Sequence, residues 1–195
     1  MSAAFPVVTL ARHGETAWTI TKQHTGRTDL PLTARGEADA RRLGARLVGQ
    51  RFARVWTSPL ARAARTCELA GFAAAAERDP DLREWDYGKY EGRTSAEILA
   101  ERPGWNLFRD GCPGGESPAQ IAARADRALA RVRACGGDAL LFSSAHFLRV
   151  FTARWLGLDV AAAGWFVLGT ASISKLGYEH ALSEPVVALW NESPP

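Results

Sequence analysis

The sequence predicts an α/β fold, a three-layer α/β/α sandwich around a mostly parallel sheet, formed by a single domain over residues 1–195. Three observations lead to this prediction. Short apolar runs of strand length alternate along the chain with longer segments whose apolar residues have helical spacing. Three of the strand-like runs end at a polar motif. The chain is 47% hydrophobic and 23% charged, which is ordinary globular usage, and its length is sufficient to bury one core.

The strand-like runs are residues 6–11 (PVVTLA), 54–57 (RVWT) and 139–142 (ALLF). The third run is apolar throughout, as expected for a strand that is buried on both faces. The polar motifs that follow the three runs are, in order, Arg12-His13-Gly14, Ser58-Pro59 and Ser143-Ser144. Because ligands bind beyond the carboxyl ends of the strands in such sheets, we expect the three motifs to share one cleft.

Helices are expected between the strands. Apolar residues with helical spacing follow Thr33, which predicts an amphipathic helix. Ser58 and Pro59 fit the N-cap and first position of a helix that runs to residue 70.

Two capping boxes predict two further helices. Ser117 and Gln120 form the first box, which opens a helix that ends at the Gly-Gly pair at 136–137. Thr94 and Glu97 form the second box, which opens a short helix that Pro103 ends.

The cations of this chain are mostly arginines. The formal net charge is +3, and Arg supplies 21 of the 24 basic residues. They alternate with Glu, Asp and Ala on predicted helices, so they indicate solvated helix faces and no nucleic-acid partner. An excess of Arg also favours bidentate recognition of phosphate or carboxylate oxygens.

Neither a membrane segment nor a disulfide framework is expected. No apolar run approaches the roughly 18 residues of a membrane span, and the N-terminal stretch lacks the basic region of a signal peptide. Cys67, Cys112 and Cys135 lie far apart without a CxxC pair, so we expect three free thiols and no zinc site. Free thiols suit a reducing compartment, and we expect a cytoplasmic protein.

The motif at residues 12–14 places a guanidinium and an imidazole side by side at a strand end. Gly14 lets the backbone turn close to a ligand. On its own, the motif is equally compatible with a surface Arg12 and a structural His13.

Two further motifs indicate anion binding and acid catalysis. Arg62 lies in the first turn of a helix that follows a strand, and helix N-termini favour anions. Glu84 is next to Trp85 and near Tyr87, an aromatic environment able to hold the proton of a carboxyl group to higher pH for acid catalysis. The alternative for Glu84 is a loop carboxylate that pairs with Arg83.

Together these motifs resemble the histidine phosphatase, or phosphoglycerate-mutase-like, superfamily, and within it the acid phosphatase and sugar bisphosphatase branch. The resemblance runs in order through LARHGETAW, HTGRTDLPLTARGE, TSPLARAART, EWDYGKYEG, GCPGGES, FLRVFTARW and TASIS. It covers most of the chain and implies a phosphoglycerate-mutase-like fold.

The resemblance also implies roles for individual residues. His13 would be the nucleophile that forms a phosphohistidine, and Arg12 and Arg62 would bind the phosphoryl oxygens. Glu84 would protonate the leaving oxygen and then activate water. The residues expected near the substrate are Thr25, Gly26 and Tyr87. Two guanidiniums supply the positive charge, so we expect no metal and no cofactor.

One position departs from the family pattern. The family carries a second catalytic histidine in a His-Gly-x-x-x-Arg motif, and counting back from Arg149 places Ser144 and Ala145 where His and Gly are expected. Ser144 is then the candidate phosphate contact. His146 matches an additional histidine of this branch and is the other candidate for the catalytic role. Positions 144 and 146 share a side only in an extended chain, and here a helix is expected.

Several segments have simpler interpretations. Residues 111–117 (GCPGGES) lack the Gly-Lys-Ser/Thr ending of a Walker motif, and we expect them to lead into the next helix, with Glu116 near the cleft. His24 and His180 show no metal-ligand pattern and are expected to be surface or hydrogen-bonded histidines. Residues 105–109 lie where related enzymes vary a lid.

Three functions are considered. The first is a phosphatase that hydrolyses a small phosphorylated metabolite, with sugar phosphates favoured by the resemblance. The second is a phosphoglycerate mutase, which is disfavoured because Ser95 stands where mutases place a lysine and no adjacent Arg pair lies between Glu84 and Ser117. The third is a catalytically weak phosphate-binding protein, suggested by Ser144. No heptad or other assembly signature indicates an oligomeric state.

Overall fold

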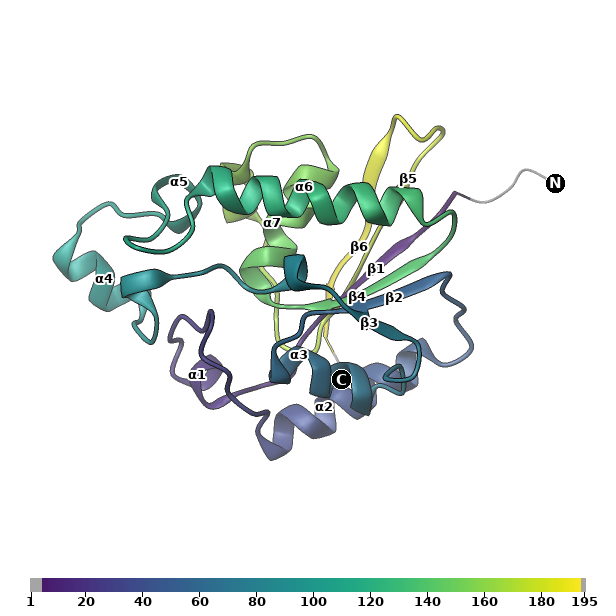
Figure 1. Cartoon of the computed structure of the whole chain (residues 1–195), viewed down its shortest axis with the longest axis horizontal. Helices are drawn as coiled ribbons and strands as arrows, with labels where there is room; N and C mark the ends of the chain where they lie inside the picture. Colours follow the sequence, from purple (N-terminus) through teal and green to yellow (C-terminus); the bar gives the residue numbers. More distant parts are fainter. Residues whose placement is uncertain (1–4, 194–195) are drawn as a thin grey trace.

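The computed structural model describes residues 5–193, which form a six-stranded sheet with helices on both faces (Figure 1). The strands are β1 (Val8–Arg12), β2 (Arg54–Thr57), β3 (Ala76–Arg78), β4 (Ala139–Ser143), β5 (Ile173–Tyr178) and β6 (Pro185–Glu192). Their order is β3-β2-β4-β1-β5-β6. The pairs β3–β2, β2–β4 and β4–β1 are parallel, whereas β5 and β6 extend the sheet in antiparallel fashion. The predicted α/β fold with a mostly parallel sheet is confirmed.

The helices are α1 (Ala17–Ile20), α2 (Ala34–Leu47), α3 (Ala61–Leu69), α4 (Ser95–Glu101), α5 (Leu107–Asp110), α6 (Pro118–Ala134) and α7 (Ala145–Trp155). Three short 3-10 turns are η1 (Pro80–Leu82), η2 (Gly88–Tyr90) and η3 (Val160–Trp165). In Figure 1, α6 and α7 cover one face of the sheet, and α2 and α3 cover the other. No helix within residues 5–193 is long and apolar enough to cross a membrane.

Strand β4 is buried on both faces, as its continuous apolar run predicts. Leu141 belongs to the apolar cluster that α6 and α7 complete. Leu140 and Phe142 belong to the opposite cluster, which includes Leu43 of α2 and Cys67 of α3. Because successive side chains of a strand point to opposite faces, β4 joins the two halves of the core.

Both predicted capping boxes are present, and Thr33 caps a third helix. The Thr33 hydroxyl accepts a hydrogen bond from the backbone N–H of Gly36 at the start of α2. The capping boxes at Thr94 and Ser117 open α4 and α6. The two capping boxes are local in sequence, which is why the sequence alone predicts them.

The prediction for the start of α3 was wrong. Ser58 is not its N-cap, because α3 begins at Ala61 and its N-cap, Leu60, makes no side-chain cap bond. The Ser58 hydroxyl accepts instead from the N–H of Leu60 at 3.3 Å. The N–H of Ala61 donates to the Asp29 carboxylate at 2.7 Å. The acceptor thus comes from a residue that is distant in sequence.

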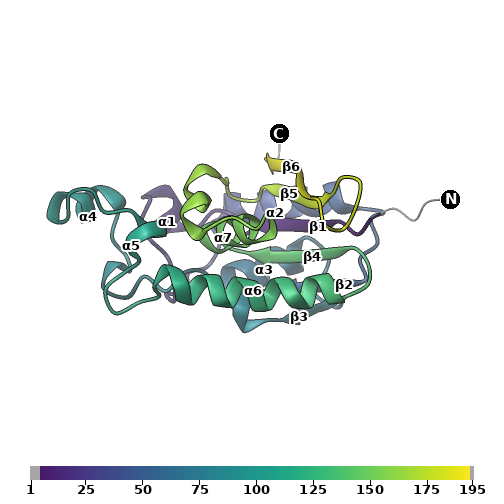
Figure 2. The ribbon, with the colours of Figure 1, turned by 90° about the horizontal axis from the view of Figure 1, so that it is seen from above.

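The carboxyl ends of β1, β2 and β4 point toward the same end of the molecule. Helices α1, α4 and α5, with the loops that join them, extend beyond this end, away from the N-terminus (Figure 2). The strand-end motifs therefore lie at the end of the sheet beyond which these short helices and loops extend.

Cys67, Cys112 and Cys135 are free thiols, as predicted.

Candidate active site

A pocket of about 350 Å³ opens at the carboxyl ends of β1 and β4. The residues that line it include six of the predicted site residues, namely Arg12, His13, Thr25, Glu84, Tyr87 and His146. The other lining residues are Trp18, Thr19, Lys22, Gln23, His24, Ser95, Ala145, Arg149, Val167 and Leu168. The remaining candidates, Arg62, Gly26 and Ser144, are not among the lining residues. Segments far apart in sequence thus form one cavity. Of the three strand-end motifs, the first contributes Arg12 and His13 to its lining, whereas Ser58-Pro59 and Ser143-Ser144 contribute no lining residue.

His13 follows β1 directly and is 3% exposed. Its backbone N–H donates to the carbonyl of Ser143 at the end of β4, which fixes the residue between the two strands. Nδ1 lies 2.8 Å from the Gly14 carbonyl oxygen, and a carbonyl only accepts, so Nδ1 carries a proton. Burial, with the charges of Arg62 and Arg12, lowers the pKa of His13 well below its ordinary value. The imidazole is therefore neutral, with a lone pair on Nε2.

Arg12 and Arg62 are the two cations whose charges act on His13. Burial lowers the pKa of Arg12 to about 10 and also lowers the pKa of Arg62, and both remain protonated at neutral pH. Arg12 donates through Nη1 to the carbonyl of Leu168. The Nε–H groups of both arginines are buried and have no acceptor among residues 5–193. Each guanidinium therefore retains one buried N–H donor that no described residue accepts.

The loop at residues 25–28 holds Arg62 in place. Nη2 donates to the carbonyls of Thr25 and Gly26, both at 2.9 Å, and Nη1 donates to the carbonyl of Thr28 at 3.1 Å. A Cβ at Gly26 would lie 2.5 Å from the Trp85 carbonyl oxygen, so only glycine permits this close approach. Thr25 and Gly26 thus orient a phosphate-binding candidate, and of the two only Thr25 lines the pocket.

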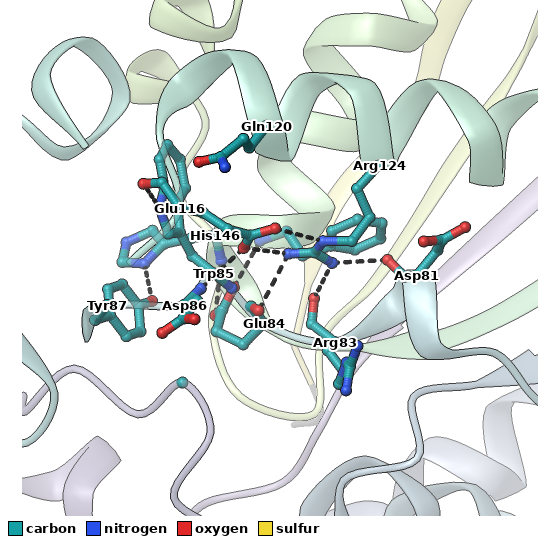
Figure 3. Close-up of polar contacts among 12 residues, drawn as sticks. Asp81, Arg83, Glu84, Trp85, Asp86, Tyr87, Glu116, Gln120, Arg124 and His146 are labelled. Atoms are coloured by element: carbon teal, nitrogen blue, oxygen red, sulfur yellow. Dashed lines mark hydrogen bonds and ion pairs between the residues drawn. The ribbon is translucent and has the colours of Figure 1, made fainter. Parts of the chain in front are cut away.

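Glu84 is held by three backbone N–H groups (Figure 3). Oε1 accepts from Trp85 at 2.9 Å and from Phe147 at 2.8 Å, and Oε2 accepts from His146 at 3.0 Å. The carboxyl group therefore caps the first turn of α7. Oε2 has one acceptor site left, which is where a transferable proton fits. The sequence predicts aromatic neighbours for Glu84, and the structure adds three backbone donors that the sequence does not predict. No ion pair joins the described side chains of Glu84 and Arg83.

Tyr87 and His146 form a second polar unit in the pocket. The Tyr87 hydroxyl lies 2.5 Å from Nδ1 of His146. Burial raises the pKa of Tyr87 well above its usual value and lowers that of His146 well below, so both groups are neutral. The phenol is the more acidic of the two neutral groups, so we assign it as the donor to Nδ1, which places the imidazole proton on Nε2. His146 therefore serves as a hydrogen-bond donor.

Ser144 occupies the turn between β4 and α7. It is the N-cap of α7, and its hydroxyl is fully buried without a partner among residues 5–193. The Glu84 carboxylate satisfies the first-turn N–H groups that this hydroxyl would otherwise cap. The chain turns into a helix at Ala145, as the sequence predicts, so positions 144 and 146 do not share an extended face.

His24 is a pocket residue that the sequence prediction places among ordinary histidines. Its ring lies 4.7 Å from that of Tyr87 and 5.8 Å from those of His146 and Trp105, measured between centroids. Ser95 lies 3.3 Å from its Nε2, so the expectation of a hydrogen-bonded histidine holds. No residue pattern around His24 in the sequence indicates that it lines the pocket.

The predicted lid segment packs against two pocket residues, although none of residues 105–109 lines the pocket itself. Trp105 packs on His24, and Phe108 lies 5.4 Å from His146 between ring centroids.

No group of three or more His, Cys, Asp or Glu side chains within residues 5–193 is arranged to hold a metal ion.

The buried histidines predict that acid destabilises the fold. Burial lowers the pKa of His24 to about 4, whereas the unfolded value is 6.5. Below pH 6.5 the unfolded chain binds a proton that folded His24 does not, so stability falls as the pH falls from 6.5 to 4. At about 1.4 kcal/mol per pH unit, His24 contributes a loss of about 3 kcal/mol.

Urea unfolding at pH 7 and pH 4.5 measures this effect. The loss of unfolding free energy should be smaller in His24→Gln than in the wild type. The exposed His180 provides the matched control, and His180→Gln should keep the wild-type pH dependence. An unchanged pH dependence in His24→Gln would contradict the prediction.

Comparison with known proteins agrees with this geometry. Residues 8–193 match the family model described as histidine phosphatase superfamily (branch 1). The chain is 40% identical over 183 residues to an acid phosphatase of Mycobacterium tuberculosis, covering 91% of this chain and 89% of that protein. It is 37% identical over 193 residues to sedoheptulose 1,7-bisphosphatase of Saccharomyces cerevisiae, covering 82% and 71%. The solved structure of the Mycobacterium tuberculosis open reading frame Rv3214 aligns with a TM-score of 0.92 at 36% identity, covering 97% and 99%.

Proposed function

The chain belongs to the histidine phosphatase superfamily (branch 1), and from this premise we propose that it hydrolyses small phosphorylated metabolites through a phosphohistidine on His13. Relatives named acid phosphatase and sedoheptulose 1,7-bisphosphatase support hydrolysis of phosphate esters. Sugar phosphates are the proposed substrate class. The hydroxyl and amide side chains of Thr19, Gln23 and Ser95 line the pocket and suit a hydroxylated substrate.

One observation carries the proposal: a neutral, buried imidazole lies within reach of two buried guanidinium charges. In the first step, Nε2 of His13 attacks phosphorus and the bond to the ester oxygen breaks. The proton on Oε2 of Glu84 moves to that leaving oxygen. Arg12 and Arg62 stabilise the charge on the remaining phosphoryl oxygens.

The second step regenerates the enzyme. Water attacks the phosphorus of the phosphohistidine, and Glu84 takes the proton that this water loses. The bond between Nε2 and phosphorus breaks, and inorganic phosphate leaves. The donor on Nε2 of His146, held by Tyr87, is proposed to bind the substrate or the departing oxygen.

The mutase alternative requires the enzyme to recognise a substrate carboxylate and to return the phosphoryl group to it. Among the pocket-lining residues, Lys22 and Arg149 are the cations besides Arg12. Arg149 already donates to the carbonyls of Ala163 and Gly164. Ser95 lines the pocket where the family resemblance expects a mutase lysine. These features favour hydrolysis.

A panel of phosphate esters tests the function. Sugar phosphates and an aryl phosphate should release inorganic phosphate, and EDTA should not change the rate because guanidiniums supply the positive charge. Conversion of 3-phosphoglycerate to its isomer would instead support the mutase. Phosphate binding without turnover of any ester would support the weak binding protein.

Glu84→Gln tests the proposed acid. The variant should slow hydrolysis of an alkyl phosphate by about 10²-fold but an aryl phosphate with a good leaving group by less than about threefold. Inhibition by inorganic phosphate should be unchanged. Asp86→Asn is the matched control, because Asp86 lies on the same loop without lining the pocket. Equal slowing of both esters would remove Glu84 from the acid role.

A further inference from the structure

An ion pair between a buried arginine and a partly buried glutamate lies outside the pocket, behind the loop that carries Glu84. Arg124 of α6 is 7% exposed, and its partner is Glu116, which precedes the helix. Two hydrogen bonds join them, from Nε to Oε1 at 2.8 Å and from Nη2 to Oε2 at 2.7 Å. Figure 3 shows the pair between α6 and the loop. The proposed reaction uses neither residue.

The remaining donors of Arg124 hold the loop backbone. Nη1 donates to the carbonyls of Asp81 and Arg83 at 2.7 and 2.6 Å. Nη2 donates to the carbonyl of Glu84 at 3.2 Å. All five N–H donors of this guanidinium therefore have acceptors, and three of the acceptors belong to residues 81–84. A lysine has no planar fork that reproduces this set.

Glu116 holds the loop on the other side of Glu84. Its Oε2 also accepts from the N–H of Asp86, its own N–H donates to the Asp86 carbonyl, and its carbonyl accepts from Nε1 of Trp85, all at 2.9 Å. Gly115 makes this contact close, because a Cβ there would lie 2.2 Å from the Asp86 carbonyl oxygen. The pair therefore fixes the backbone both before and after Glu84.

The same guanidinium also contacts the helix turn that holds the carboxyl group. Cζ of Arg124 lies over the ring of Phe147, 4.8 Å from its centroid. The N–H of Phe147 donates to Oε1 of Glu84. Arg124 thus links the backbone of Glu84 to the donor that orients its side chain.

Neighbouring arginines on α6 do not share these contacts. Arg127 and Arg131 bind the carboxylates of Asp81 and Asp79, and their side chains are 58% and 41% exposed. They contact the edge of the loop through side chains, whereas Arg124 binds its backbone.

From these contacts we propose that Arg124 and Glu116 are positioning residues that hold Glu84 where it exchanges its proton with the substrate. The inference rests on the proposed role of Glu84 as the acid. General acid catalysis depends on geometry, and a displacement of about 1 Å costs up to about 10²-fold in rate. Removing the ion pair should therefore slow hydrolysis with the same preference for alkyl over aryl esters that removing the Glu84 carboxyl group produces.

The experiment compares Arg124→Gln, Arg124→Lys and Glu116→Gln with the control Arg127→Gln, using an alkyl phosphate and an aryl phosphate. Arg124→Gln should slow the alkyl ester by about 10-fold to 10²-fold and the aryl ester by less than about threefold. Arg124→Lys should not restore the rate. Glu116→Gln should show the same selectivity with a smaller loss, and it serves as the test if Arg124→Gln does not fold. The control should match the wild type.

Combination with Glu84→Gln separates positioning from a structural effect. The double variant Arg124→Gln/Glu84→Gln should hydrolyse the alkyl ester no more slowly than Glu84→Gln alone. Equal slowing of both esters, or additive losses, would overturn the inference while leaving the proposed function intact. If Glu84→Gln itself shows no selectivity between the esters, the proposed role of Glu84 fails, and the inference fails with it.

Discussion

Replacing His13 with alanine should lower the turnover number for every phosphate ester by more than about 10⁴-fold, because the variant has no atom that attacks phosphorus. The structure supports a large effect. Nδ1 is occupied by the Gly14 carbonyl, so Nε2 is the nitrogen that remains for reaction. Inorganic phosphate should still inhibit or bind, because Arg12 and Arg62 keep their positions through contacts that do not involve His13.

Acid-labile phosphate on the protein provides a second measurement of the same prediction. Rapid quenching with a labelled aryl phosphate should trap label on the wild type and none on His13→Ala. The exposed His180→Ala is the control and should trap label as the wild type does. Label on His13→Ala, or activity within about 10²-fold of the wild type, would show that another group attacks the phosphorus.

Much of the fold is predictable because its signals are local. Strands β1, β2 and β4 follow from short apolar runs, and the caps at Thr94 and Ser117 follow from residues three positions apart. The start of α3 does not follow, because the acceptor for its first N–H is Asp29, which tertiary structure brings there.

The site likewise combines residues with a local sequence signal and contacts that only the tertiary structure creates. His13, Arg12 and Glu84 stand in recognisable motifs, and the structure brings all three into one pocket. The environment of Glu84 was not predictable, because its three donors come from Trp85 and from the first turn of a helix about sixty residues further along the chain. His24 was missed for the same reason, since its importance comes from packing against Tyr87 and not from its neighbours in sequence.

The family resemblance places Ser144 where the family carries its second histidine, and we propose that an imidazole at this position supplies a missing donor. His146 lies in the pocket, but its Nδ1 is bound to Tyr87, and the charges that act on it are those of Arg149, His24 and Arg12. The charges that act on His13 are those of Arg62 and Arg12. Arg12 thus acts on both imidazoles, and the hydrogen bond to Tyr87 leaves Nε2 of His146 as the nitrogen that is available to a ligand. We propose that the phosphoryl group lacks one donor near Ser144.

The double change Ser144→His with Ala145→Gly should raise turnover by about 10²-fold, because one preorganised donor to a developing oxyanion is worth about 10²–10³ in rate. Ser144 has extended backbone angles that accept histidine, and its own hydroxyl makes no hydrogen bond within residues 5–193 that the change would break. Ala145 lines the pocket, so removing its methyl group makes room for the imidazole.

Steady-state rates on an aryl phosphate check this prediction, with Ala145→Gly alone as the control. That single variant makes the room without adding the donor and should stay within about threefold of the wild type. His146→Ala should lose less than about 10-fold if His146 contacts only the substrate beyond the phosphoryl group. A double variant no faster than the wild type, together with a His146→Ala variant that is inactive, would show that His146 already supplies the second imidazole despite its position on α7.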